Sequence, residues 1–479
     1  MLVIISDLHL TDGSSGETVH QGTLRVFRER LRNLAYAASW RADGKYRPIE
    51  EMNIVLLGDI LDALRSSKWL EEGTGNPSSV RPWDDPRSEA FAQKVDAITK
   101  AILARNAIFF TMLRELQRTS LTSIPLATEN GRPARVAQGA GSLPKFPVRV
   151  RIHYMVGNHD WFYHLPHSAY QGIRKKIVEA LGLENDPRQP FPHDPMEPFA
   201  AAIQQVFDEH RVFARHGDIY DPFNFEEHRD QASLGDAIVI DLLSNFAAEV
   251  KSKLGDSLPL ECLAGFQELD NVRPLLMAPV WLGGLLRRTC PDRRVHRQVQ
   301  EVWNDLADRF LKIPFVRQRL TSRRSWMHAQ KLQWALRLSR GLLSPESGRI
   351  ICWAGERIGS RKSSYYPYAL REQAFRSRKA RFIIYGHTHR HEMIPLDSSY
   401  LFSQLYLNSG TWRPVHELTR FQPNREAFIG YHTMTYLAFF KDDERNGRAF
   451  ESWSGGLAKS VQRFQADAEP ENNSRNEGL

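Results

Sequence analysis

Five short motifs along the chain contain side chains that could bind metal ions. Together they provide two carboxylates, one amide and four imidazoles, from Asp7, His9, Asp59, Asn158, His216, His387 and His389. This mixture of nitrogen and oxygen ligands suits Mn²⁺, Fe²⁺, Zn²⁺ or Co²⁺ better than Ca²⁺. Seven ligands are enough for two ions, since the carboxylate of Asp59 could bridge two cations through its two oxygens. We therefore expect two divalent metal ions, with Mn²⁺ favoured, as the cofactor.

Each motif follows a short apolar run that predicts a buried strand. The runs are residues 2–5, 53–57, 148–156, 212–215 and 381–385. In α/β proteins, the loops at the carboxyl ends of such strands are the usual place for a binding site. The sequence therefore predicts an α/β fold in which the motifs meet at one edge of a sheet.

The motif set D-x-H, G-D-x-x-D, G-N-H-D, a single H and G-H-x-H resembles that of the calcineurin-like metallophosphoesterases. The resemblance covers residues 1–5, the motif loops and the C-terminal strands. It implies a four-layer αββα sandwich, and two large, mainly helical insertions lie outside the resemblance. It also implies two metals that share one carboxylate and a water or hydroxide. The first metal would be held by Asp7, His9, Asp59 and His389, and the second by Asp59, Asn158, His216 and His387.

The same resemblance suggests further roles around the metals. His159 would protonate the leaving oxygen or stabilise the developing charge, a role that suits the pKa of an imidazole. Asp160 is expected to orient His159, and Asp62 and Asp218 are candidates to support the ligands from behind. Among the ligands, His216 has the shortest motif, and two other histidines compete for its place, His210 and His228.

The charge of the chain favours anionic partners. Its 479 residues include 64 Lys/Arg and 56 Asp/Glu, a net charge of +8. Residues 273–340 alone contain 15 basic and four acidic residues, together with four tryptophans. This segment is either the solvated face of a helical cap with tryptophans in its core or an anion-binding lid. Arg390, directly after the last histidine motif, and Arg413 could also reach a phosphate of the substrate.

The motifs and the long segments between them divide the chain into six parts. The core is expected at residues 1–62, 148–219 and 380–465. An insertion of helix and loop is expected at residues 63–147, and a basic helical insertion that forms a cap or lid at residues 220–379. Residues 466–479 are expected to form a disordered tail. Apolar spacing predicts helices at residues 25–38 and 89–118. A further helix is predicted near residues 295–310, where Val295, Val299, Val302, Leu306 and Phe310 repeat on one face.

The sequence predicts a cytoplasmic protein. The N-terminus has no signal-peptide pattern, and the three cysteines lack the spacing of a disulfide framework or zinc ribbon. The uncharged, apolar stretch at residues 274–286 is far shorter than the roughly 20 apolar residues of a spanning helix, so no transmembrane segment is expected. That stretch and the arginines after it could make a peripheral membrane contact. The oligomeric state is left open.

Two neighbouring metals suit phosphoryl chemistry, because they generate a hydroxide nucleophile and neutralise phosphate oxygens. We therefore expect hydrolysis of a phosphodiester by attack of a metal-activated hydroxide. Nucleases and general phosphodiesterases of the family share the histidine found here at position 159, whereas its UDP-2,3-diacylglucosamine pyrophosphatases typically have an arginine after the asparagine. Nucleic acid or nucleotide is therefore the leading substrate class. Three alternatives stay open: a pyrophosphatase acting on a nucleoside-diphosphate lipid or sugar, a phosphomonoesterase or protein phosphatase, and a non-catalytic metal-binding scaffold.

Overall fold

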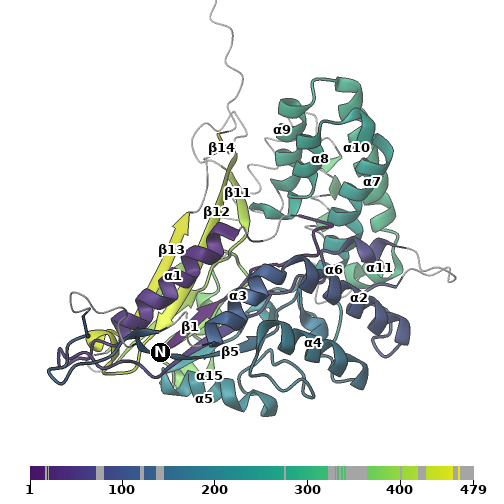
Figure 1. Cartoon of the computed structure of the whole chain (residues 1–479). Helices are drawn as coiled ribbons and strands as arrows, with labels where there is room; N and C mark the ends of the chain where they lie inside the picture. Colours follow the sequence, from purple (N-terminus) through teal and green to yellow (C-terminus); the bar gives the residue numbers. More distant parts are fainter. Residues whose placement is uncertain are drawn as a thin grey trace, which may run out of the picture.

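The folded chain is built around two mixed β-sheets, one of eight strands and one of four (Figure 1). The computed structural model describes residues 1–16, 19, 21–71, 80–118, 123–135, 145–273, 277–321, 330, 332–333, 336–337, 339–340, 364–399, 402–418, 428–456 and 462–463. Helices and mixed sheets confirm the predicted α/β class. The predicted disordered tail, residues 466–479, lies outside the described residues.

The first sheet has the strand order β5-β2-β1-β12-β11-β7, with β13 and β14 also paired to β12. Its strands are β1 (Leu2–Ile5), β2 (Glu51–Leu57), β5 (Arg149–Met155), β7 (Val272–Arg273), β11 (Pro414–Leu418), β12 (Phe428–Phe439), β13 (Phe450–Gly456) and β14 (Gln462–Arg463). Strand β1 runs parallel to β2, with Leu2 opposite Asn53, and antiparallel to β12, with Leu2 opposite Phe439. The parallel strands β1, β2 and β5 therefore end at the same edge of the sheet.

The second sheet has the order β6-β8-β10-β9. Its strands are β6 (Val212–Ala214), β8 (Phe382–Tyr385), β9 (Glu392–Ser398) and β10 (Ser403–Asn408), and a separate pair is formed by β3 (Ile124–Pro125) and β4 (Lys145–Phe146). Strands β6, β8 and β10 are parallel. The motif-bearing strands are thus divided between two sheets, whereas the apolar runs alone predicted one. Strand β10 ends at Asn408, and residues 409–412 form a loop.

The alternation of apolar side chains explains why the two sheets face each other. In β1, Leu2 and Ile4 point to one face and pack in a shared cluster with Ile384 of β8 and Leu407 of β10. Val3, between them, points to the other face and joins the cluster formed by the N-terminal helices. Both faces of β1 are therefore buried, as expected for a central parallel strand.

Helices cover the outer face of the first sheet. They are α1 (Gln21–Ala38), α2 (Glu89–Arg105), α3 (Ala107–Gln117) and α4 (Gln171–Leu181), while α5 (Ala201–Glu209) packs at the cluster between the sheets. The single helix predicted at residues 89–118 is divided in two at Asn106, whose side-chain amide donates to the carbonyls of Thr11 and Ile102. Both halves pack in the core cluster of the first sheet, so this insertion is part of the core.

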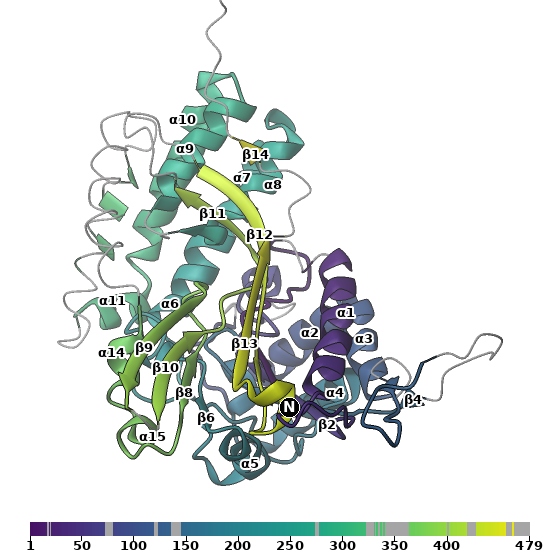
Figure 2. The same ribbon diagram turned by 90° about the vertical axis from the view of Figure 1, so that its left-hand side faces the viewer.

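The basic insertion forms a separate helical layer beside the extended ends of β11 and β12 (Figure 2). It contains α6 (Leu234–Ala237), a π-helical segment (Ile238–Ser244), α7 (Asn245–Leu254), α8 (Leu260–Phe266), α9 (Ala278–Thr289), α10 (Arg293–Phe310) and α11 (Pro314–Thr321). The apolar stripe predicted for α10 is buried from Val295 to Phe310. The insertion also contributes β7, which pairs with β11. At its end, α14 (Tyr366–Ala369) and α15 (Gln373–Arg376) pack against the second sheet.

The structure does not support membrane contact through residues 274–286. Residues 274–276 lie outside the described residues, and the apolar side chains of α9, including Trp281 and Leu285, are buried in the core of the helical layer. No helix in the described part of the chain is long and apolar enough to span a membrane. Trp303 is buried as well, so neither described tryptophan of this segment is free to stack on a base.

Candidate metal centre

The expected metal ligands lie in the loops that follow the strands, where the chain turns sharply. Asp7, His9, Asp59, His387 and His389 all have positive φ angles, between 48° and 66°. Residues other than glycine avoid this left-handed conformation, and such strain is found mainly at functional sites. The loops are joined by backbone hydrogen bonds, since the N–H of Asp7 donates to the carbonyl of Gly58 (3.1 Å) and that of His9 to the carbonyl of Asp59 (2.9 Å).

The first group of ligands surrounds the carboxylate of Asp7. Candidate ligand atoms of Asp7, His9, Asp59 and His389 all lie within 4.8 Å of one another. His389 Nε2 is 3.3 Å from Asp7 Oδ1 and 2.9 Å from His9 Nε2. These four residues are the set predicted for the first metal, and the structure brings them together.

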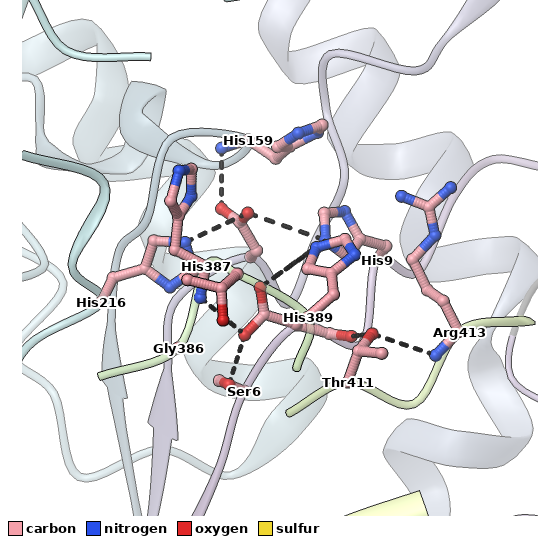
Figure 3. Close-up of polar contacts among 12 residues, drawn as sticks. Ser6, His9, His159, His216, Gly386, His387, His389, Thr411 and Arg413 are labelled. Carbon is pink, nitrogen blue, oxygen red and sulfur yellow. Dashed lines mark hydrogen bonds and ion pairs between the residues drawn. The ribbon is translucent and has the colours of Figure 1, made fainter. Parts of the chain in front are cut away.

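The second group lies on the other side of Asp59. His216 Nε2 is 3.2 Å from Asp59 Oδ2, and the ring of His216 meets that of His387 at a centroid distance of 5.3 Å. Asp59, His216 and His387 can jointly hold an ion. Figure 3 shows His216 and His387 on one side of the site and His9 and His389 on the other. Asp59 belongs to both groups, as a bridging carboxylate would.

The choice of His216 over its competitors agrees with the structure. His216 is buried at the site, where its Nδ1 shares a hydrogen bond of 3.0 Å with the carbonyl of Leu57. His210 is also buried, but its Nδ1 is bonded to the carbonyl of Val206 in the preceding helix. His228 is exposed.

Four buried ligand atoms have no hydrogen-bond partner among the described residues. They are Asp7 Oδ1, Asp59 Oδ2, Asn158 Oδ1 and His216 Nε2. A buried polar atom without a partner is costly, and native structures contain few of them. All four belong to the seven predicted ligands. The residues present therefore fit a pair of divalent cations, which would satisfy these atoms.

Burial and neighbouring charges shift the pKa values of the ligand groups, and against the effect of burial the carboxylates of Asp59 and Asp7 raise the pKa of His216 to about 10. Burial, with the nearby Asp59 carboxylate, raises the pKa of Asp7 to about 6. Burial would also raise the pKa of Asp59, but His216 holds it below its usual value. Burial and the positive charge of Arg413 lower the pKa of His9 to about 3, so its ring is neutral at pH 7. Neutral imidazoles are the form that binds metals.

Close backbone approach requires a glycine at the last motif. A Cβ atom at Gly386 would lie 2.6 Å from Asp7 Oδ2 and 2.7 Å from Ser6 Oγ. The amide of the next residue, His387, donates to the same Asp7 Oδ2 over 3.2 Å. Only a residue without a side chain allows this loop to hold the Asp7 carboxylate from behind.

His159 lies beside the ligands, but its carboxylate partner is not the one expected. Its Nδ1 is 2.7 Å from Asp62 Oδ1, while the other Asp62 oxygen lies 2.8 Å from His9 Nδ1. Asp160 instead accepts hydrogen bonds from the amides of Gly157 and Ile60 and from the hydroxyl of Tyr154. Because its two oxygens are engaged by these donors, Asp160 shapes the loop and Asp62 orients the ring.

The carboxylates around His159 set its charge. Burial alone would lower the pKa of His159, but Asp62 and Asp59 raise it to about 9. The imidazole is therefore protonated near neutral pH and can act as an acid. Asp218, the other carboxylate expected behind the ligands, is paired with Arg229, which also donates to the carbonyl of Gly157 over 2.9 Å.

The two arginines expected to reach a phosphate differ in their surroundings. Arg413 is buried, with its guanidinium bonded to Asp270 (3.0 Å) and to Asn271. Arg390 is exposed and is not among the residues that line the cavity at the site. The described contacts therefore place Arg413 in a buried ion-pair network beside the site.

Three site residues were missed by the sequence analysis: Asp221, Asp270 and Arg273. Asp221 Oδ2 lies 3.1 Å from His387 Nε2. Arg273, from β7, donates to His389 Nδ1 over 2.6 Å, and Asp270 lies between Arg413 and Arg65. No motif marks these three residues, although Arg273 is the first residue of the basic segment at residues 273–340.

A cavity of about 430 Å³ extends from the metal centre into the helical layer. At its polar end it is lined by Asp59, Asn158, His159, His387 and His389, together with Asp270 and Arg273. Its other walls are mainly apolar and come from Ile238, Val239, Leu242 and Leu243 of the π-helical segment and from Trp303 of α10. π-Helical segments are rare and occur often at functional sites.

A search with models of known protein families and a search of curated proteins both found no match to this chain. The family resemblance therefore stays a prediction from the motifs.

Proposed function

We propose that this protein is a metal-dependent hydrolase of phosphodiesters, with the metallophosphoesterase architecture that its motifs resemble. The observation that supports this most directly is the set of four unpartnered ligand atoms in one buried site of the described chain. The two facing sheets, with helices outside the first and α14 and α15 outside the second, are compatible with a four-layer αββα arrangement.

Two divalent ions bound by the seven predicted ligands would supply a hydroxide nucleophile near neutral pH and positive charge for the phosphate oxygens. Mn²⁺ is our preferred metal. The chain itself would provide the remaining functions. His159, protonated and held by Asp62, is placed to donate a proton to the leaving oxygen.

Positive charge beside the site supports an anionic substrate. Arg65, Arg273 and Arg413 surround one carboxylate, Asp270. Burial lowers the pKa of Arg65 and of Arg273 to about 10, so both keep their charge at neutral pH. Arg273 lines the cavity next to His389, and we assign it, in place of Arg390 and Arg413, as the arginine that contacts a phosphate group.

The test of this function compares bis-p-nitrophenyl phosphate with p-nitrophenyl phosphate, with Mn²⁺ added or chelated. Mn²⁺-dependent turnover that favours the diester is expected. A preference for the monoester would favour the phosphatase alternative. If the fully metal-loaded protein hydrolyses neither ester, activity on simple aryl phosphates is contradicted. The alkyl p-nitrophenyl phosphates described below then become the test.

The apolar cavity favours a second candidate function, hydrolysis of a phosphate ester or pyrophosphate that carries an apolar group, such as a nucleoside-diphosphate lipid. A nucleic-acid strand is charged along its whole length, and burying charge in an apolar cavity is unfavourable. Trp281 and Trp303 are each 3% exposed, so they offer no stacking surface to bases. The walls from the π-helical segment would instead contact hydrocarbon.

This candidate predicts that activity rises with the length of an alkyl group on the substrate. For methyl, butyl and octyl p-nitrophenyl phosphates, each buried methylene contributes about 0.8 kcal/mol, so kcat/KM should rise roughly fourfold per methylene until the cavity is full. In Ala278→Phe, whose new ring would occupy the cavity, the advantage of the octyl ester over the methyl ester should disappear. Equal kcat/KM values for all three esters in the wild-type protein would contradict an apolar subsite.

A further inference from the structure

A second cluster of potential metal ligands lies outside the site described above. It consists of His164, at the end of the short helix η2 (Trp161–His164), His193 in the loop after α4, and Glu197, directly before η4 (Pro198–Ala200). His164 Nε2 is 2.9 Å and His193 Nδ1 is 3.0 Å from the same oxygen, Glu197 Oε1. The two imidazole rings meet edge to face, with centroids 4.9 Å apart.

The ligand atoms of this cluster are oriented by contacts behind them. The other ring nitrogen of His164, Nδ1, lies 2.6 Å from Asp230 Oδ1. The other oxygen of Glu197, Oε2, accepts hydrogen bonds from the amides of His193 (2.9 Å) and Asp194 (3.2 Å), which turns Oε1 towards the histidines. A carboxylate behind the remote ring nitrogen is characteristic of histidines that bind metals.

One atom of the cluster remains unsatisfied. His193 Nδ1 is buried and has no hydrogen-bond partner in the described part of the chain, although Glu197 Oε1 is 3.0 Å away. The hydrogen-bonding direction of the ring nitrogen therefore misses that oxygen. A hydrogen-bonded ion-pair network of His164, Glu197 and Asp230 leaves this nitrogen unexplained, whereas a cation between the three groups would engage it.

We propose that His164, His193 and Glu197 bind one Zn²⁺ ion, at a site separate from the two metals of the proposed function. Two imidazoles and one carboxylate are a ligand set that zinc uses, with a water molecule in the fourth position. The side chains of His164, Glu197 and His193 are 12%, 17% and 23% exposed, which leaves room for that water. The proposal does not depend on phosphoesterase activity.

The zinc ion would connect two loops that lie next to the proposed catalytic site. η2 begins directly after the Asn158–Asp160 motif, and Asp230 follows Arg229, which donates to Gly157 of the same motif region. Through His164 and Asp230, the ion would connect this region to the loop of His193 and Glu197. We therefore assign the site a structural role.

Zinc stoichiometry in the full-length chain tests the proposal. Chelator-treated protein is dialysed against Zn²⁺, freed of excess metal and analysed for zinc per chain in the wild type, Asp59→Asn and Glu197→Gln. The expected values are three, one and two ions. The amide oxygen of the introduced glutamine would still accept the backbone hydrogen bonds, so Glu197→Gln removes the charge with little change of shape. Glu209→Gln, at a surface carboxylate of α5, is the matched control.

The result that would overturn the proposal is equal zinc content in the wild type and Glu197→Gln. Loss of all zinc in Asp59→Asn would do the same. If Glu197→Gln does not fold, as judged by circular dichroism, Co²⁺ binding to Asp59→Asn decides. One tightly bound Co²⁺ per chain, with the intense visible absorption of four-coordinate cobalt, is expected, and its absence would contradict the site. Retention of this ion by a chain without phosphodiesterase activity would separate failure of the proposed function from failure of the zinc site.

Discussion

Asp59→Asn is expected to lose the two catalytic metal ions and phosphodiesterase activity together. Asp59 Oδ2 is 3.2 Å from His216 Nε2 and 3.7 Å from His9 Nε2, so this one oxygen faces both ligand groups. An asparagine has the same shape, but it brings no negative charge to neutralise two cations. We expect kcat/KM to fall by at least about 10³-fold, the scale of losing a group that stabilises transition-state charge.

The measurement combines metal analysis with turnover of bis-p-nitrophenyl phosphate at saturating Mn²⁺. Asp256→Asn, at an exposed carboxylate in the helical layer, serves as the control for a change of charge alone. Wild-type activity in Asp59→Asn would show that Asp59 is not the bridging ligand.

The sequence was sufficient to predict which side chains meet at the site, because each of them follows an apolar run directly. Asp7 follows β1 and Asp59 follows β2, and both strands are almost wholly apolar. When such strands are parallel and adjacent, their C-terminal loops must meet. The pairing of Leu2 with Asn53 and the contact between the two loops follow from this pattern. Local sequence and topology therefore agree at this part of the site.

Contacts that depend on tertiary structure were harder to predict. Asp62 and Asp160 both stand close to the ligands in sequence, and only the fold shows that Asp62 reaches His159 while Asp160 binds backbone amides. Similarly, 15 basic residues lie between residues 273 and 340, and nothing in their spacing marks Arg273 as the one beside His389. Strand β7, which positions Arg273, has only two residues and depends on its pairing with β11.

The same limit applies to the helical layer. Helix α10 could be predicted from the sequence because apolar residues repeat along one of its faces. Sequence spacing could not reveal that residues 238–244 form a π-helical segment or that they line a cavity at the metal centre. The cavity supports the second candidate substrate class, because its walls are mainly apolar and the described tryptophans of the segment, Trp281 and Trp303, are buried, whereas most of its described arginines are exposed. The cavity and its lining thus depend on packing that composition does not report.

His159→Ala should retain metal but lose turnover, because the ring contacts Asp62 and the cavity and is not among the predicted ligands. A general acid contributes about 10²- to 10⁴-fold, so kcat should fall by that factor for a diester whose leaving group is an ordinary alcohol. Asp62→Asn should give a smaller loss, about 10- to 100-fold, since it removes the carboxylate that orients His159 and also contacts His9.

The leaving group separates proton donation from simple charge stabilisation by His159. p-Nitrophenolate leaves readily without a proton, whereas an alkoxide does not. If His159 is the acid, His159→Ala will slow hydrolysis of an alkyl diester far more than that of bis-p-nitrophenyl phosphate. Equal losses for both substrates would instead indicate that the cationic ring acts on the phosphate oxygens. Loss of bound metal in His159→Ala would contradict both roles, because the ring would then be needed to maintain the ligand set rather than to act on the substrate.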